Sequence, residues 1–167
     1  MAESTGKIHI PRRGTHGARV GELMLRALRP FAGFETSRYQ RVTTPEPARF
    51  MGFPVLVLTT IGARSGKERN AVLGAFPESD NAWLIIGSKS GAASNPNWLY
   101  NLARNPDRIW AQVGNRKFRA NVESLQGKER DDAYARVATA APQYGGYRDK
   151  TDREIPVLRV TPAESRP

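Results

Sequence analysis

The chain has 167 residues and carries 26 Lys and Arg against 16 Asp and Glu, which gives a formal net charge of +10. It contains no cysteine, so disulfides, thiolate nucleophiles and cysteine-bound zinc are excluded. Its two histidines, His9 and His16, stand in the first 16 residues, so the rest of the chain cannot supply a Ser–His–Asp triad, a histidine-rich metal site or a histidine general base. If the chain is an enzyme, we expect a bound cofactor, and no metal, to carry the difficult chemistry.

Length and composition predict one globular domain. The chain is 39% hydrophobic and 25% charged, as soluble proteins are. Apolar runs such as residues 55–58 are far below the roughly 20 residues of a membrane span, and no apolar stretch typical of a secretory signal opens the chain. We therefore expect a cytoplasmic protein. Its surplus of positive charge favours an anionic partner: phosphate, polycarboxylate, nucleic acid or a lipid headgroup.

The first 50 residues hold nine Lys or Arg against four acidic residues. Residues 1–17 combine Gly, Pro and charge, and are predicted to form a flexible basic arm. Residues 18–50 are predicted to form a helix, which Pro30 ends near Arg29, and a linker. The helix is indicated by an apolar stripe formed by Val20, Leu23, Met24, Ala27, Leu28 and Phe31. We interpret the stripe as covering the core or a homodimer seam; contact with an anionic membrane surface is the alternative.

Residues 51–167 are predicted to form a β-rich domain, because short β-branched and apolar runs alternate with turn residues. Six strands are expected, at residues 54–60, 69–76, 82–88, 109–113, 117–125 and 156–161. The first two are joined as a hairpin by residues 61–67, while residues 77–81 and the pair Gly114-Asn115 are predicted turns. This order indicates an antiparallel sheet that closes into a small barrel.

Two helices are expected to pack outside this barrel. Asn95 and Pro96 predict an N-cap and a first helical position, and this helix is expected to end near Asn105. A second helix is predicted over residues 128–140, and Pro142 with the glycines that follow breaks it. The predicted fold class is therefore α+β, mainly β, with about six antiparallel strands and outer helices.

Residues 59–69 concentrate cations and a hydroxyl around two glycines, Gly62 and Gly66. The polar members are Arg64, Ser65, Lys67 and Arg69. Glycines permit backbone conformations whose N–H groups point at an anion, and Arg and Lys bind phosphate or carboxylate through charge-assisted hydrogen bonds. The spacing is not that of a P-loop. An anion site and a solvated basic hairpin tip are therefore interpretations of equal weight.

Residues 87–98 run from the end of a predicted strand to the start of a predicted helix. Unpaired N–H groups and the helix macrodipole favour anions at such a place, and Ser88 and Lys89 add further donors. Trp98 is interpreted either as a wall for a flat ring or as a core residue.

The third candidate segment, residues 144–156, opens with Tyr144 and Tyr147 on either side of two glycines. Two such rings either cover a pocket or pack with their hydroxyls in water.

The three segments together resemble the deazaflavin-dependent nitroreductase family, small reductases that use coenzyme F-420. In chain order they match T-T-x-G-x-[RK]-[ST]-G-x-x-R, then S-K-x-G-[x]3-N-P-x-W-[x]2-N-L-[x]2-N-P, then Y-x-x-Y-[x]3-T-D-R-x-I-P. The likeness covers roughly residues 50–162, and three motifs in one order are far more specific than one. It implies a split β-barrel with outer helices that passes a hydride from reduced coenzyme F-420 to a quinone, a nitro-aromatic compound or an α,β-unsaturated carbonyl.

The resemblance also implies a role for each segment. The residues that would bind the phosphodiester, the polyglutamate tail and the ring edge of the coenzyme are Arg64, Ser65, Gly66, Lys67, Arg69, Ser88, Lys89 and Gly91. Trp98, Tyr144 and Tyr147 would line the side of the acceptor. The proton for the reduced acceptor would come from Ser88, Tyr144, Tyr147 or water.

Two positions depart from the pattern of the family. Relatives often carry Tyr where this chain has Ala141, a change that widens the implied acceptor pocket. Relatives often have two basic residues where this chain has Ala63 and Arg64, which weakens one anion contact that Lys67 can offset.

Three alternatives to this reductase stay open. A split barrel can bind FMN or haem, and it can also carry a deazaflavin without catalysis. A basic nucleic-acid-binding barrel is the third, although exposed aromatic residues interleaved with Lys and Arg are not evident on the predicted strands.

Overall fold

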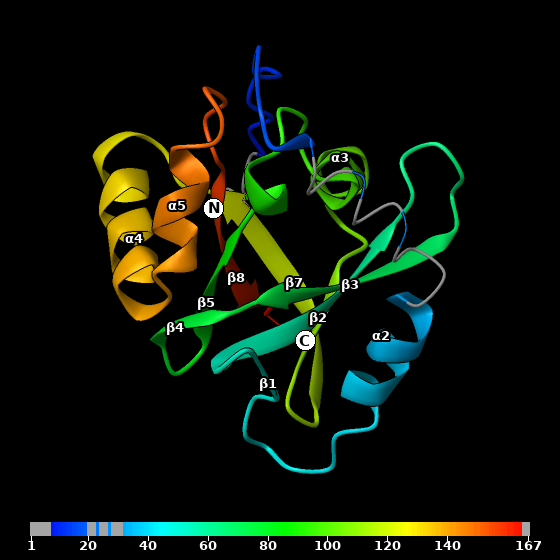
Figure 1. The fold of residues 1–167 in the computed structure, drawn as a ribbon. Coiled ribbons are helices and arrows are strands. Elements are labelled where there is room, and N and C mark those ends of the chain that lie inside the picture. Colours follow the sequence, from blue (N-terminus) through cyan, green and yellow to red (C-terminus); the bar gives the residue numbers. More distant parts are fainter. Residues whose placement is uncertain (1–7, 20–22, 24–26, 28–31, 165–167) are drawn as a thin grey trace.

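The computed structural model describes residues 8–19, 23, 27 and 32–164, and an eight-stranded antiparallel sheet forms their centre. The strands are β1 (Arg49–Phe50), β2 (Phe53–Ile61), β3 (Glu68–Gly74), β4 (Phe76–Ser79), β5 (Ala82–Ile86), β6 (Trp110–Val113), β7 (Arg116–Ser124) and β8 (Val157–Pro162). Their order is β1-β2-β6-β7-β8-β5-β4, and β3 pairs with β2 off this path. The sheet curls into a half-barrel (Figure 1), which confirms the predicted β-rich fold class.

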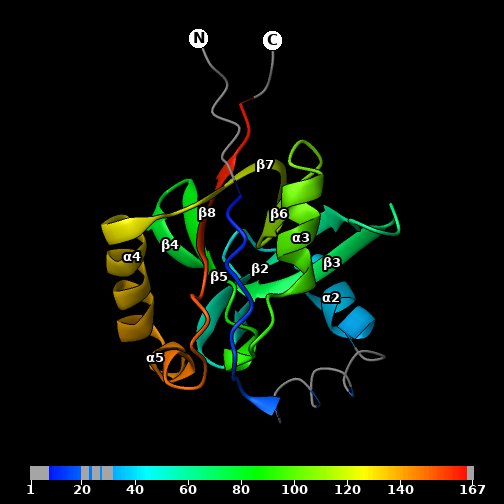
Figure 2. The same ribbon diagram turned by 90° about the horizontal axis from the view of Figure 1, so that it is seen from above.

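Helices flank the sheet on two sides in both views (Figures 1 and 2). The helical elements are α2 (Ala32–Gln40), the short 3-10 turn η2 (Lys89–Gly91), α3 (Asn97–Arg104), α4 (Gly127–Ala140) and α5 (Gln143–Arg148). α4 and α5 lie on one side, and α2 and α3 lie on the other. Within the described ranges, no helix is long and apolar enough to cross a membrane.

Two apolar clusters share strands β5 and β8, because successive side chains of a strand point to opposite faces. Ile85 and Leu158 belong to the first cluster, which α3 also joins. Leu84 and Val157 belong to the second cluster, which includes residues of α4 and α5. A strand buried on both faces is apolar throughout, and β5 is buried at all five positions.

The predicted strand over residues 69–76 is wrong, because the chain divides there into two strands. β3 pairs with β2, whereas β4 pairs with β5, and the amide of Ala75 between them donates to the carbonyl of Pro54 at 2.8 Å. The predicted turn over residues 77–81 shortens accordingly to residues 80 and 81. Pro77 is tolerated in β4 because that strand is at the edge of the sheet, where a missing N–H breaks no ladder.

The predicted helix break after Pro142 is also wrong in part. Pro142 is the N-cap of α5, and the two glycines lie inside this short helix. Glycine disfavours helix, but the hydroxyl of Tyr134 donates to the carbonyl of Tyr144, and the Tyr144 ring is buried. Tertiary packing therefore overrides the local preference.

The N-terminal predictions can be compared with the structure only in part. The predicted apolar stripe over residues 20–31 lies outside the described residues, except for Leu23 and Ala27, and Leu23 is 72% exposed. The predicted linker contains α2 and β1. β1 is a two-residue strand that makes a hairpin with the start of β2.

Candidate functional site

The first cationic segment forms the tip of the β2–β3 hairpin. The amide of Gly62 donates to the carbonyl of Lys67 at 2.8 Å, and Gly66 adopts a left-handed φ of +65° that closes the turn. Arg64, Lys67 and Arg69 are all exposed. The predicted cations therefore lie on one accessible hairpin.

Helix α3 holds this hairpin through two asparagines, one helical turn apart. Asn101 accepts from the amide of Ala63 at 2.9 Å and donates to Thr60 Oγ1 at 3.1 Å. Asn105 donates from Nδ2 to the carbonyl of Ile61 at 3.1 Å. The asparagines of the second motif therefore position the first segment, a role that the sequence pattern left unassigned.

The second segment makes a strained turn at η2. Lys89 and Ser90 have φ values of 45° and 55°, and Gly91 follows at +80°. Residues other than glycine avoid this left-handed region, so the surrounding structure must hold them there. The ammonium of Lys89 donates to Ser94 Oγ at 2.6 Å, and Ser88 is 9% exposed.

The guanidinium of Arg153 holds the residues around η2 in place. Arg153 is 4% exposed and donates to the carbonyls of Gly87 and Ser88 at 3.2 and 3.0 Å, to the carbonyl of Ala92 at 3.1 Å and to Asn95 Oδ1 at 2.9 Å. Burial lowers the pKa of Arg153, but an arginine stays protonated in proteins. One buried cation therefore fixes both ends of the segment that contains η2.

The predicted N-cap at Asn95 is wrong for the same reason. Helix α3 has Pro96 as its N-cap, with no side-chain cap hydrogen bond. The Asn95 amide accepts from Arg153 and donates to the carbonyl of Pro11 at 2.7 Å. The Asn95 side chain, which the local sequence predicts to cap the helix, therefore makes long-range hydrogen bonds instead.

The predicted flexible arm is hydrogen-bonded to the barrel over its described part. Asp152 accepts from the amide of Thr15 at 2.8 Å and from its hydroxyl at 2.6 Å, and Thr151 donates to the carbonyl of His16 at 2.9 Å. The amide of Gly14 donates to the carbonyl of Ala93 at 2.9 Å. We call residues 8–18 the strap, because they run beside the second segment, where the amide of Ala18 also donates to the carbonyl of Gly91 at 2.9 Å.

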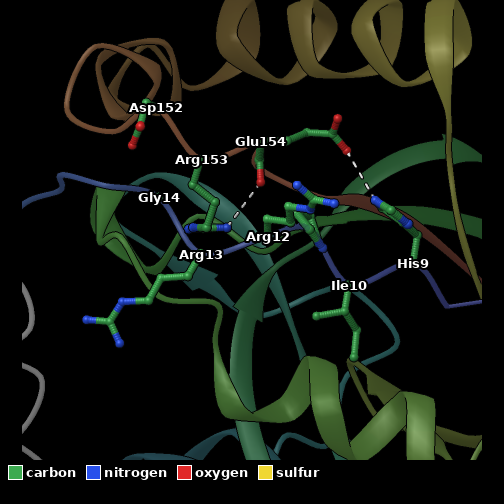
Figure 3. Close-up of a pocket in the computed structure, with 9 residues that line it drawn as sticks. His9, Ile10, Arg12, Arg13, Gly14, Asp152, Arg153 and Glu154 are labelled. Carbon is green, nitrogen blue, oxygen red and sulfur yellow. Dashed lines mark hydrogen bonds and ion pairs between the residues drawn. The ribbon is translucent and has the colours of Figure 1, made fainter.

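A hollow of about 450 Å³ lies between the strap and residues 152–154 (Figure 3). His9 and Glu154 face each other across it, 3.9 Å apart. None of the residues predicted to bind a cofactor lines this hollow. The predicted residues are instead on the hairpin, on η2 and on α5.

The third segment places its tyrosines in an aromatic cluster. The Tyr144 ring lies 6.0 Å from Phe53, 5.4 Å from Phe76 and 5.4 Å from Tyr147. Tyr144 is 8% exposed, and burial raises its pKa to about 12, so its hydroxyl keeps its proton at neutral pH. A Cβ added to Gly74 would lie 2.6 Å from that hydroxyl, so a side chain there would collide with it.

The structure brings the second and third segments together and leaves Trp98 apart. A Cβ added to Gly91 would lie 2.8 Å from Lys150 Cβ and 3.1 Å from the Tyr147 carbonyl, so η2 touches the end of α5. In both views α5 lies on one side of η2 and α3 on the other, with the hairpin beyond α3 (Figures 1 and 2). Trp98 packs against the first apolar cluster, whereas the tyrosines belong to the second.

The profile of the F420H(2)-dependent quinone reductase family matches residues 33–162. The chain belongs to this family. A relative in Mycobacterium tuberculosis, the F420H(2)-dependent quinone reductase Rv1261c, is 34% identical over 113 residues, which are 65% of this chain and 73% of that protein. The family is one of oxidoreductases, and its cofactor is F420H(2), the reduced form of coenzyme F-420.

Solved structures agree with this assignment. One described as an F420-H2 dependent reductase, FDR-A, is 34% identical, with a TM-score of 0.57 over 64% of this chain and 93% of its own. Another, described as a domain-swapped dimer, is 27% identical, with a TM-score of 0.59 over 86% of this chain and 99% of its own. The split barrel implied by the three motifs is therefore confirmed.

Replacing Arg153 is expected to release the second segment. Arg153→Lys keeps the charge but cannot reach four acceptors, so the free energy of unfolding should fall by about 2–4 kcal/mol. Amides of residues 88–93 should exchange with deuterium faster than in the wild type. Arg104→Lys, at an exposed position on α3, is the control and should change neither. Unchanged exchange in Arg153→Lys would contradict the role of Arg153.

The strap is expected to detach in acid. The hydroxyl of Thr15, followed by the amide of His16, lowers the pKa of Asp152 from 3.8 to about 2. Because the folded pKa is lowered, this stabilisation is complete above about pH 4 and is lost as the pH falls toward 2. Deuterium exchange of residues 14–18 should therefore rise over that window. Asp152→Asn should flatten the dependence, and Asp107→Asn, an exposed control, should preserve it.

Proposed function

We propose that this chain transfers a hydride from F420H(2) to a quinone, with nitro-aromatic compounds and α,β-unsaturated carbonyls as further acceptors. The observation that carries the proposal is the position of η2. A buried arginine holds this turn between an exposed cationic hairpin on one side and a tyrosine cluster on the other. When bound, F420H(2) supplies the hydride, and the chain positions the two reactants.

The hairpin and η2 have the donors that an anionic coenzyme requires. Arg64, Lys67 and Arg69 are exposed beside Ser65 and Gly66, and Glu68 is the only acid among residues 59–69. Charge-assisted hydrogen bonds from these groups suit a phosphodiester and a polycarboxylate tail. Ser88, Lys89 and Gly91 would contact the phosphate or the ring edge. The residues present therefore fit the group.

The tyrosine cluster suits the acceptor. Its members Phe53, Phe76, Tyr144 and Tyr147 give an apolar wall that excludes water from the transferred hydride. Ala141 is 3% exposed in the same cluster, and its small side chain leaves more room there than the tyrosine of many relatives. We assign proton donation to the hydroxyl of Tyr144, because a phenol is protonated at neutral pH and this one belongs to the cluster proposed to receive the acceptor.

The direct test is the absorbance change of F420H(2) oxidation with menadione as acceptor. Turnover that depends on both compounds supports the proposal. Absence of both coenzyme binding and turnover would refute it. Nitro-aromatic and α,β-unsaturated carbonyl compounds, assayed in the same way, decide the range of acceptors.

Charge reversal tests the side that binds the coenzyme. Arg69→Glu and Lys89→Glu should each raise the Kd for F420H(2) at least about tenfold, measured by tryptophan fluorescence quenching, because each places a carboxylate against an anion. The control is Arg12→Glu combined with Arg13→Glu on the strap, which changes the net charge more and should leave the Kd nearly unchanged. Equal losses of affinity for F420H(2) in both sets of variants would show that the positive charge acts through the overall field of the protein and not through these residues.

Removal of one hydroxyl tests the acceptor side. Tyr144→Phe keeps the ring contacts, so Kd for F420H(2) should stay the same while kcat for menadione falls by at least about tenfold. Tyr100→Phe, at an exposed position on α3, is the matched control and should keep full activity. Unchanged kcat in Tyr144→Phe would move the proton donor to Tyr147, Ser88 or water.

A further inference from the structure

The turn between β1 and β2 exposes two apolar side chains at its tip. Met51 is 77% exposed and Phe50 is 42% exposed. Met51 and Gly52 have φ values of 48° and 87°, the left-handed pair that closes a two-residue hairpin. Asn, Asp or Gly is favoured at both positions of such a turn, so a methionine adds apolar surface where the backbone favours a polar or small residue.

A basic hollow adjoins this tip. It has a volume of about 420 Å³, and its lining residues are Arg38, Tyr39, Arg41, Val42, Thr43, Thr44, Ala48 and Arg49. Three of them are arginines and none is acidic. Arg49 also donates to the carbonyl of Gly52 at 2.7 Å, which ties the hollow to the turn.

The turn between β6 and β7 adds more positive charge to the same end. The backbone amide of Asn115 donates to the carbonyl of Thr44 at 2.8 Å, and its side-chain Nδ2 donates to the carbonyl of Thr43 at 2.8 Å. Arg116 and Lys117 follow and are exposed. Figure 1 shows α2 and the two turns at one end of the molecule. The acids of residues 32–50 are Glu35 and Glu46, so the five cations Arg38, Arg41, Arg49, Arg116 and Lys117 outnumber them here.

We propose that this end is a membrane-docking surface, in which Phe50 and Met51 enter the interface of the bilayer and the arginines of the hollow bind phosphate groups of anionic lipids. Apolar side chains flanked by arginines are what an anionic lipid surface binds, because burial of the former adds to attraction of the latter. We call Phe50, Met51 and the three arginines the docking tip.

The docking tip leads to the proposed acceptor side, and this part of the inference rests on the proposed function. The Phe50 and Phe53 rings are 6.2 Å apart, and Phe53 lies 6.0 Å from Tyr144. Successive ring contacts therefore join the docking tip to the tyrosine cluster. A quinone with a long apolar tail resides in the bilayer, so docking through this end would bring the tyrosines near it.

A second copy of the chain fits this surface less well than a bilayer. A two-fold dimer buries the same patch on both subunits, so the arginines of one hollow would face those of the other. Nucleic acid is also a poorer match, because Met51, the more exposed of the two apolar residues of the tip, has no ring to stack on a base.

Vesicle co-sedimentation tests the proposal with the full chain. The wild type should bind vesicles that contain phosphatidylglycerol at least about tenfold more tightly than vesicles of phosphatidylcholine alone. Phe50→Ser combined with Met51→Ser should lower binding at least about tenfold. Arg38→Gln combined with Arg41→Gln should remove the preference for anionic lipid. This variant keeps Arg49, because Arg49 supports the turn.

Matched controls separate the docking tip from other apolar and basic positions. Tyr100→Ser replaces an aromatic residue with the same exposed fraction as Phe50, and Arg12→Gln with Arg13→Gln removes two exposed arginines from the strap. Both should bind vesicles as the wild type does. Leu23→Ser, at an exposed position of the N-terminal stripe, should also keep binding. Loss of binding only in Leu23→Ser would overturn the proposal in favour of the N-terminal segment.

Other outcomes overturn it in other ways. If the wild type binds no anionic vesicles, membrane docking is refuted. If the tip variant instead abolishes a concentration-dependent dimer in analytical ultracentrifugation, the surface is a dimer interface. If Arg38→Gln with Arg41→Gln abolishes binding to an oligonucleotide while vesicle binding is absent, the partner is nucleic acid.

Two assays keep this inference distinct from the proposed function. Turnover of a water-soluble quinone without vesicles should be equal in the wild type and in Phe50→Ser with Met51→Ser. Turnover of a long-chain quinone embedded in anionic vesicles should fall about tenfold in the variant. If the wild type oxidises F420H(2) with neither of the two quinones, the proposed function is refuted. Vesicle co-sedimentation then still decides whether the docking surface binds membranes.

Discussion

The guanidinium of Arg153 is the interaction on which the site depends. Four acceptors from Gly87 to Asn95 receive its hydrogen bonds inside the protein, where an unpaired cation would be costly. These bonds allow Lys89 and Ser90 to keep a backbone conformation that they would otherwise avoid. Asp152, the neighbour of Arg153, fastens the strap over the same segment. A single T-D-R sequence thus determines how η2 is presented.

Positive charge divides into groups with different surroundings. Arg153 is buried and structural, whereas the cations of the hairpin tip are exposed at the place proposed for the coenzyme. The arginines beside β1 form a third group, next to exposed Phe50 and Met51. The net charge of +10 therefore has several causes, and no single anionic partner has to account for all of it.

The family assignment and the geometry meet at the tyrosine cluster. A quinone reductase must keep water away from the hydride and still deliver a proton to the acceptor. The Tyr144 side chain lies among Phe53, Phe76 and Tyr147, and burial raises its pKa to about 12. Under the proposed function, this buried phenol would shield the hydride from water and donate the proton, while Trp98 packs in the other apolar cluster.

The sequence by itself determined most strands, the limits of α3 and α4 and the cationic hairpin, because period-two apolar runs, glycine turns and proline stops are local signals. The three motifs, taken in order, also determined the family. Only the tertiary structure decided the roles of Asn95, Asp152 and Arg153, whose partners are dozens of residues away. It also decided that β3 and β4 are separate strands and that the glycines after Pro142 are helical. In each case a long-range hydrogen bond or the burial of a ring outweighs a local preference worth about 1 kcal/mol, and sequence spacing contains no record of that contact.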